Sequence, residues 1–257
     1  MTPFTLRPWA AGVRDDVTDI NGRNRSYLLQ AWYGHLFEFT DDHSLGLVGG
    51  IIDATDYLDD NTYANDEYTQ FMNEALVNGP NTFLPSWDIG GVGRWRFGNF
   101  DITAVYMNIG ENDDGNNFNF FGGQLAYTLE SSIGEGHYRV LIDGASKAFL
   151  NPEGTSKENR ATFGISFDQQ LGENFGAWLR WYWQDDSALV NYKSIYSGGV
   201  FISGNLWGRE QDSIGIGYGY LDGAEQTEDS LKNTHVAEAY VNVGLHEYLL
   251  LTFDYST

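Results

Sequence analysis

Three polar or aromatic side chains alternate with other residues along the segment 175–184. Trp178, Arg180 and Tyr182 occupy every second position, and a β-strand sends such residues to one face. Aromatic rings stack on the apolar C–H faces of sugars, and guanidinium groups donate hydrogen bonds to hydroxyl oxygens. This face therefore has the chemistry of a weak, non-covalent site for a polyhydroxylated solute.

The same alternation predicts further inward side chains on other segments. Arginines that face acids across a passage would set a field that orients a polar solute. The alternative interpretation is that these arginines and acids only satisfy one another on the wall of a sheet. The residues are Arg94, Arg96, Arg139, Glu238 and Tyr240, with Asn242 on the face of the last two.

These side chains need strands to position them, and a two-residue rhythm of apolar and polar residues runs nearly end to end. The rhythm predicts an all-β, antiparallel up-and-down sheet of about twelve to fourteen strands. The high aromatic content favours a closed transmembrane β-barrel whose apolar face looks outward into lipid. The expected strands are 4–13, 26–39, 44–52, 90–97, 100–109, 117–130, 136–146, 159–170, 174–184, 192–203, 211–221, 235–245 and 248–255.

Outward positions on these strands are rich in aromatic residues, whereas many inward positions hold glycine. In the segment 214–220 every second residue is glycine, which is typical of a path that must stay clear or of a close approach. Aromatic residues expected in the lipid face or the interfacial girdle are Phe163, Phe167, Trp181, Trp183, Tyr218, Tyr220, Phe253 and Tyr255.

Short and long connections tend to alternate, which predicts one rim of tight turns and one rim of long loops. We interpret residues 1–257 as one barrel domain with a long loop insertion at 53–89. Within the insertion, apolar residues between 68 and 76 have helical spacing and predict a short helix. This loop could fold over the rim or into the lumen as a constriction.

Composition excludes several classes of protein. The chain has 36 acidic against 14 basic residues, a net charge of −22, so nucleic acid is not an expected partner. No apolar run approaches the roughly 18 residues of a membrane-spanning helix. The acids cluster in segments expected to be solvated loops, although carboxylates could also bridge divalent cations at a lipopolysaccharide surface.

Catalytic signatures are weak in this sequence. There is no cysteine, and the five histidines do not show metal-ligand spacing. No Gly-x-Ser-x-Gly elbow appears, and adjacent carboxylates such as Asp185 and Asp186 are frequent in a chain with this many acids. We therefore expect no enzyme, no cofactor, no metal and no catalytic residue.

Several stretches resemble the carbohydrate-selective porins of Gram-negative outer membranes, the glucose-porin family. The resemblance runs from about residue 25 to about residue 255. It is carried by Gly50-Ile-Ile-Asp-Ala-Thr-Asp-Tyr-Leu-Asp-Asp-Asn61, Ala64-Asn-Asp-Glu-Tyr-Thr-Gln-Phe-Met-Asn73, Tyr106-Met-Asn-Ile-Gly-Glu-Asn-Asp-Asp-Gly-Asn-Asn117, Tyr196-Ser-Gly-Gly199, Arg209-Glu-Gln-Asp-Ser-Ile-Gly-Ile-Gly-Tyr218 and Glu238-Ala-Tyr240.

The resemblance implies an outer-membrane barrel of sixteen strands, often packed as trimers, that passes small sugars down a gradient. The chain departs from that pattern because it is short for sixteen strands and lacks a terminal aromatic residue. The sequence alone does not determine whether its strands close into a barrel without further strands. Two other interpretations remain. One is a soluble β-sheet carbohydrate-binding module, and the other is a structural barrel that supports a membrane partner.

Overall fold

The computed structural model describes residues 28–112, 114–227 and 231–257. They form a single antiparallel sheet in which each strand pairs with its sequence neighbours, in the order β1 to β12. The strands are β1 Ala31–Thr40, β2 His43–Ile52, β3 Asp88–Phe97, β4 Phe100–Ile109, β5 Phe118–Ser131, β6 Gly134–Leu150, β7 Lys157–Leu171, β8 Phe175–Gln184, β9 Tyr192–Ser203, β10 Ser213–Gly223, β11 Thr234–His246 and β12 Leu249–Ser256.

The predicted all-β, up-and-down architecture is confirmed. Twelve predicted strands match the twelve of the sheet, most within about three residues at each end. The thirteenth predicted strand, 4–13, lies outside the described residues. The largest difference at a strand start is in β1, which begins at Ala31 rather than 26.

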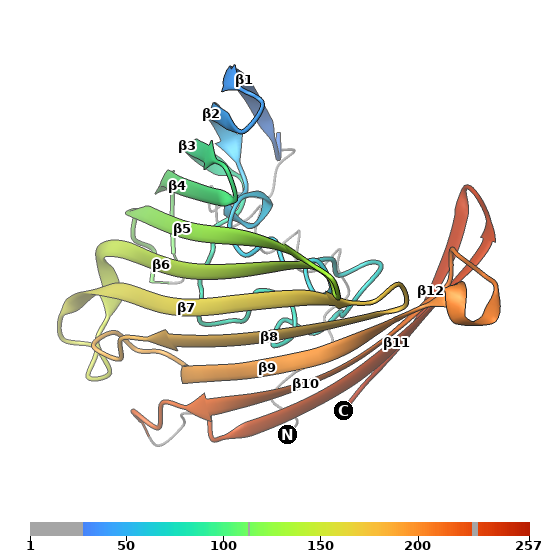
Figure 1. The fold of residues 1–257 in the computed structure, drawn as a ribbon. Helices are drawn as coiled ribbons and strands as arrows, with labels where there is room; N and C mark the ends of the chain where they lie inside the picture. Colours follow the sequence, from blue (N-terminus) through green and yellow to red (C-terminus); the bar gives the residue numbers. More distant parts are fainter. Residues whose placement is uncertain (1–27, 113, 228–230) are drawn as a thin grey trace.

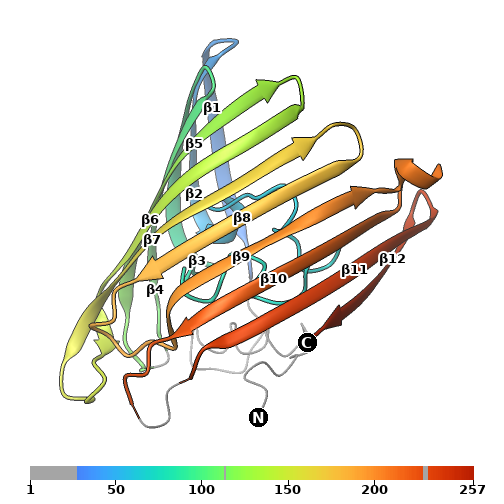
Figure 2. The same cartoon turned by 60° about the horizontal axis from the view of Figure 1, so that its bottom comes forward.

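The sheet is strongly curved, and its two edge strands lie apart (Figures 1 and 2). Within the described residues β1 pairs with β2 alone and β12 with β11 alone. The fold is that of a barrel wall with one concave and one convex face. Apolar side chains such as Ile142, Leu179 and Ile216 are more than half exposed on the convex face, at 62%, 52% and 51%.

The connections divide into two rims, as the sequence predicts. One rim consists of tight turns such as 41–42, 98–99 and 172–174, together with a longer connection at 204–212 that contains the 3₁₀ helix η2 (Gly204–Trp207). The other rim consists of the segments 53–87, 110–112, 114–117, 151–156, 185–191, 224–227 and 231–233. A site near the second rim is therefore built mainly from loops and strand ends.

The segment 53–87, which we call the inner loop, lies against the concave face (Figure 2). It begins with the 3₁₀ helix η1 (Ala54–Asp56). Two groups of buried apolar residues hold it against the wall. One joins Leu58 to Met107, Phe120 and Leu141, and the other joins its residues Phe71, Ala75 and Leu76 to Trp178, Ile195 and Tyr240.

The short helix predicted within residues 68–76 is wrong, because the inner loop forms successive turns there. The amide N–H groups of Met72 and Asn73 donate to the carboxylate of Glu238 on β11, at 2.5 and 3.1 Å. These donors are consequently withdrawn from the carbonyl groups four residues earlier that a helix would use. The apolar spacing instead reflects packing against the wall, where Phe71 is fully buried.

Glycines on the concave face make room for large rings. A Cβ atom at Gly164 on β7 would overlap the ring of Tyr182 on β8, and one at Gly217 on β10 would press on Phe71. The alternating glycines of 214–220 therefore mark a close approach. In this segment Ile216 and Tyr218 point outward and are half exposed, which confirms the predicted register.

Candidate functional site

Arg180 on β8 is the central anchor of the inner loop. Its Nε lies 2.7 Å from Asp59 Oδ2, and its other nitrogens donate to the carbonyl oxygens of Leu76 and Ala64 at 2.7 and 2.5 Å. Arg180 is 1% exposed and Asp59 is 0% exposed. One guanidinium thus ties three points of the inner loop to the wall.

A second anchor joins β6 and β7 to the beginning of the inner loop. Arg139 bridges Asp60 at 2.7 Å and Asp168 at 2.5 Å. Asp168 also accepts the hydroxyl of Thr62 at 2.8 Å and contacts His137 Nδ1 at 2.8 Å. These residues form a polar network with several hydrogen bonds. Removing one member of such a network leaves the other buried groups without partners and destabilises the fold.

The third anchor lies near the edge of the sheet, on β11 and β12. Besides the Glu238 contacts, Asn242 Nδ2 donates to the carbonyl oxygen of Thr69 at 2.6 Å. The hydroxyl of Thr252 on β12 donates to the carbonyl oxygen of Tyr68 at 2.9 Å. The inner loop therefore spans the concave face from β2 to the opposite edge strand.

The predicted aromatic residues contribute packing to the same interface. The ring of Phe71 lies 5.5 Å from that of Trp178 and 5.0 Å from that of Tyr240. Tyr182 is fully buried, and its carbonyl oxygen accepts from Asn81 Nδ2 at 3.2 Å. These rings are covered by the inner loop rather than presented to an open passage.

Arg94 and Arg96 on β3 behave differently, because both stay exposed on the concave side. Arg94 pairs with Asp101 at 2.8 Å and lies 4.0 Å from Asp60, and Arg96 lies 3.6 Å from Asp101. The structure thus separates the predicted site residues into two groups. The first group contacts the inner loop and consists of Arg139, Trp178, Arg180, Tyr182, Glu238 and Tyr240. The second group, Arg94 and Arg96, lies on an exposed part of the concave face.

Two ionisable groups of the inner loop are shifted by their surroundings. Burial raises the pKa of Tyr63, and the nearby charge of Asp168 adds to the effect. Burial, followed by the charge of Asp53, raises the pKa of Asp56. Both shifts are consistent with a loop that is enclosed by the sheet and not spread over its rim.

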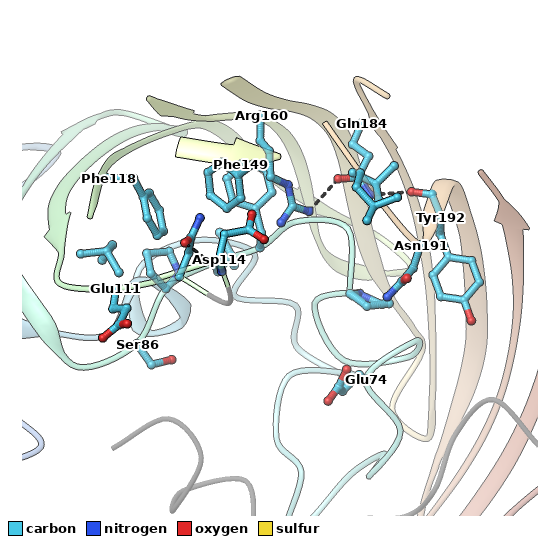
Figure 3. Close-up of a pocket in the computed structure, with 18 of the residues that line it drawn as sticks. Glu74, Ser86, Glu111, Asp114, Phe118, Phe149, Arg160, Gln184, Asn191 and Tyr192 are labelled. Atoms are coloured by element: carbon cyan, nitrogen blue, oxygen red, sulfur yellow. Dashed lines mark hydrogen bonds between the residues drawn. The ribbon is translucent and has the colours of Figure 1, made fainter. Parts of the chain in front are cut away.

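An open cavity of about 640 Å³ lies at the long-loop rim, between the inner loop and the ends of strands β3 to β9 (Figure 3). We call it the rim pocket. Its apolar lining comes from Phe83, Leu84, Phe118, Phe149 and Leu189, among others. Its polar lining is Glu74, Ser86, Asp88, Glu111, Asn112, Asp114, Arg160, Gln184, Asn191 and Tyr192.

Arg160, near the start of β7, is held against one wall of the rim pocket. Its guanidinium carbon lies 4.2 Å from the ring centroid of Phe83 and 5.3 Å from that of Phe149. Its Nη2 donates to Gln184 Oε1 at 2.8 Å, as the dashed line in Figure 3 shows. Stacking and hydrogen bonding therefore fix the orientation of this cation.

Sequence reasoning missed the rim pocket. Its members fall at strand ends and in loops, where the two-residue rhythm carries no information about facing. Arg160 and Gln184 do share the inward face of their strands with Thr162 and Tyr182, so the alternation could have placed them inward. Phe83, by contrast, comes from the inner loop at a left-handed φ of 41°, which no strand pattern predicts.

The described residues contain neither a cluster of three or more His, Cys, Asp or Glu side chains suited to a metal ion nor a helix long and apolar enough to cross a membrane.

Solved structures share this fold. *Pseudomonas putida* OprB, in a high-pH structure, matches with a TM-score of 0.71 at 12% identity over 89% of this chain and 67% of that one. *Pseudomonas aeruginosa* OccK11 (OpdR) matches with a TM-score of 0.53 at 10% identity, over 88% and 64%. At these identities the likeness concerns the fold alone, an all-β sheet of antiparallel up-and-down strands that is consistent with a barrel.

No family model matches the sequence. A protein of *Aquifex aeolicus* (strain VF5), described as uncharacterized, is 31% identical over 253 residues, which cover 98% of this chain and 70% of that protein. The chain belongs to the same protein family as this *Aquifex aeolicus* protein.

Proposed function

We propose that this chain forms the wall and the constriction of a porin in the Gram-negative outer membrane. Its role is the passive, selective diffusion of small carbohydrates, without covalent chemistry. The observation that carries the proposal is the inner loop, which lies inside the concave face and is tied to it by Arg180, Arg139 and Glu238. A fixed loop inside a barrel wall narrows the lumen and sets a size limit.

The two groups of predicted site residues take different roles in this proposal. Arg94 and Arg96 face the passage and contact solute directly. Arg139, Arg180 and Glu238 act by fixing the constriction, as do Trp178, Tyr182 and Tyr240 through packing. The rim pocket is the first place where a sugar would dwell, since apolar walls and hydrogen-bonding groups converge there.

The convex face supports placement in lipid. Its apolar side chains are exposed along most strands, and a soluble β-sheet module would bury such a face in a core. Lipid and lipopolysaccharide are then the surroundings of the barrel, and a homotrimer is the assembly that we propose.

The test is single-channel recording of the detergent-purified protein in planar bilayers, with mono- and disaccharides added. Stepwise conductance that sugars reduce at millimolar concentration is the expected result. A protein that stays soluble without detergent would favour the carbohydrate-binding module instead. Insertion without conductance would favour the structural barrel, in which the inner loop acts as a permanent plug.

A further inference from the structure

The rim pocket has the size and the position of an entrance site. Its volume of about 640 Å³ lies within the range of roughly 300–1,000 Å³ that small-molecule sites occupy. Its walls come from the inner loop and from the ends of strands on the long-loop rim.

The described lining of the rim pocket carries more negative than positive charge. Among the described residues of the lining there are four carboxylates, of Glu74, Asp88, Glu111 and Asp114, and one guanidinium, that of Arg160. Asp88 Oδ2 accepts from the amide of Gly110 and Asp114 Oδ2 from that of Leu150, so these two acids also serve the local fold.

Glu74 and Glu111 are different, because their carboxylates form no hydrogen bond or ion pair with other residues that the structure describes. Glu74 comes from the inner loop and Glu111 from the connection between β4 and β5. In the view of Figure 3 both lie below Arg160, Glu111 to its left and Glu74 to its right. Both carboxylates are thus available to a ligand.

Arg160 offsets only part of this negative field, because it carries one positive charge against four carboxylates of the described lining. Its guanidinium stacks on the rings of Phe83 and Phe149 and donates to Gln184 Oε1, which holds it at the wall. An ammonium group in the pocket gains Coulomb energy from the carboxylates, whereas an added carboxylate is repelled.

We infer that the rim pocket selects cationic hydroxylated solutes, with amino sugars as the solute class, over neutral and anionic sugars. The aromatic and apolar walls contact the ring of the solute, and the negative charges of the lining, those of Glu74 and Glu111 among them, attract its ammonium group. This inference deepens the proposed function. The role of the pocket in transport rests on that function, whereas binding to the pocket is measurable without transport.

The first test is calorimetric titration of the detergent-purified protein with glucosamine, glucose and gluconate at neutral pH. We expect glucosamine to bind roughly fivefold more tightly than glucose, the range of one partly exposed charge pair, and gluconate to bind most weakly. The double variant Glu74→Gln/Glu111→Gln should lower the ratio of glucosamine affinity to glucose affinity towards one, with Asp88 and Asp114 left to supply the remainder. Equal affinities of the unaltered protein for glucosamine and glucose would overturn the inference.

A matched control separates the pocket from the overall charge of the protein. Glu130→Gln/Glu173→Gln removes the same two charges at the opposite rim, where both side chains are exposed. We expect this control to keep the preference for glucosamine. An equal loss in the control and in the pocket variant would assign the preference to net charge and refute the pocket.

Bilayer recording under a salt gradient distinguishes this inference from the proposed function. A channel that passes cations preferentially, with the preference lowered in the pocket variant alone, supports both. Binding discrimination without a channel supports the pocket and contradicts the porin. Conductance and sugar block without charge discrimination leave the porin standing and refute the pocket.

Discussion

Arg180 on the wall and Asp59 in the inner loop form an ion pair of 2.7 Å that is almost completely enclosed by protein. Asp59 adopts a left-handed φ of 56°, unusual for a residue other than glycine. Its amide donates to Gln124 Oε1 at 2.8 Å, so the strained residue is held from both sides. The position of the inner loop therefore depends strongly on this contact.

Replacing Arg180 by methionine should release the inner loop. The change leaves the buried Asp59 carboxylate without its ion-pair partner and two buried carbonyl groups without donors. Breaking a buried ion pair in this way lowers the free energy of unfolding by about 3–5 kcal/mol. The free energy of unfolding in urea and the rate of proteolysis within residues 59–80 measure the effect. Arg180→Met combined with Asp59→Asn should recover part of the loss, because the uncompensated charge is removed.

The control is Arg94→Gln, which breaks an exposed ion pair with Asp101 on the same concave face. Exposed pairs contribute about 0–1 kcal/mol, so this variant should unfold nearly as the wild type does. If Arg180→Met were equally mild, the inner loop would not depend on its central anchor.

Glu238→Gln tests the anchor near the edge of the sheet. In the wild type the two oxygens of Glu238 accept hydrogen bonds from the N–H groups of Met72 and Asn73. The glutamine side chain has only one oxygen acceptor for these two donors. Loss of one such bond at a buried donor should cost about 1–3 kcal/mol. Amide hydrogen exchange at Met72 and Asn73 should accelerate, while the amides of β5 and β6 keep their protection. Unchanged exchange at both amides would rule out the anchor.

The strands were predictable because each obeys one strong rule, the alternation of outward apolar and inward small or polar residues. Gly164, Ser166 and Asp168 on β7 show why this works, since all three face inward in the register that the sequence predicts. The outward direction of the aromatic residues follows from the same alternation and does not depend on which residues they contact. A local pattern with a period of two therefore carries the fold.

The use of the inward residues could not be predicted in the same way. The alternation places Arg180 and Glu238 on the concave face, but their partners lie more than 100 residues away in sequence. The inner loop also depends on left-handed residues such as Asp59, which no propensity predicts. Long-range hydrogen bonds, rather than local spacing, determine where the inner loop meets the predicted inward face.

Gly164→Ala tests the close packing between the neighbouring wall strands β7 and β8. The added methyl group would overlap the ring of Tyr182, which is fully buried. Overpacking of this kind costs about 1–3 kcal/mol. Gly49→Ala is the matched control, since a Cβ there has no neighbour within 4 Å. Urea unfolding of the two variants should differ clearly, and equal stabilities would contradict the packing.

The connection at 204–212 should respond to acid. The hydrogen bond from Arg209 holds the pKa of Asp212 at about 2, below its usual 3.8, and the indole N–H of Trp207 donates to the same carboxylate at 3.2 Å. Because the folded pKa is lowered, the stabilisation of this turn is present above pH 3.8 and is lost as the pH falls towards 2. Tryptophan emission of the wild type, minus that of Trp207→Phe, should change with a midpoint near pH 2. A midpoint at the ordinary value of 3.8 would mean that Arg209 does not stabilise the ionised carboxylate.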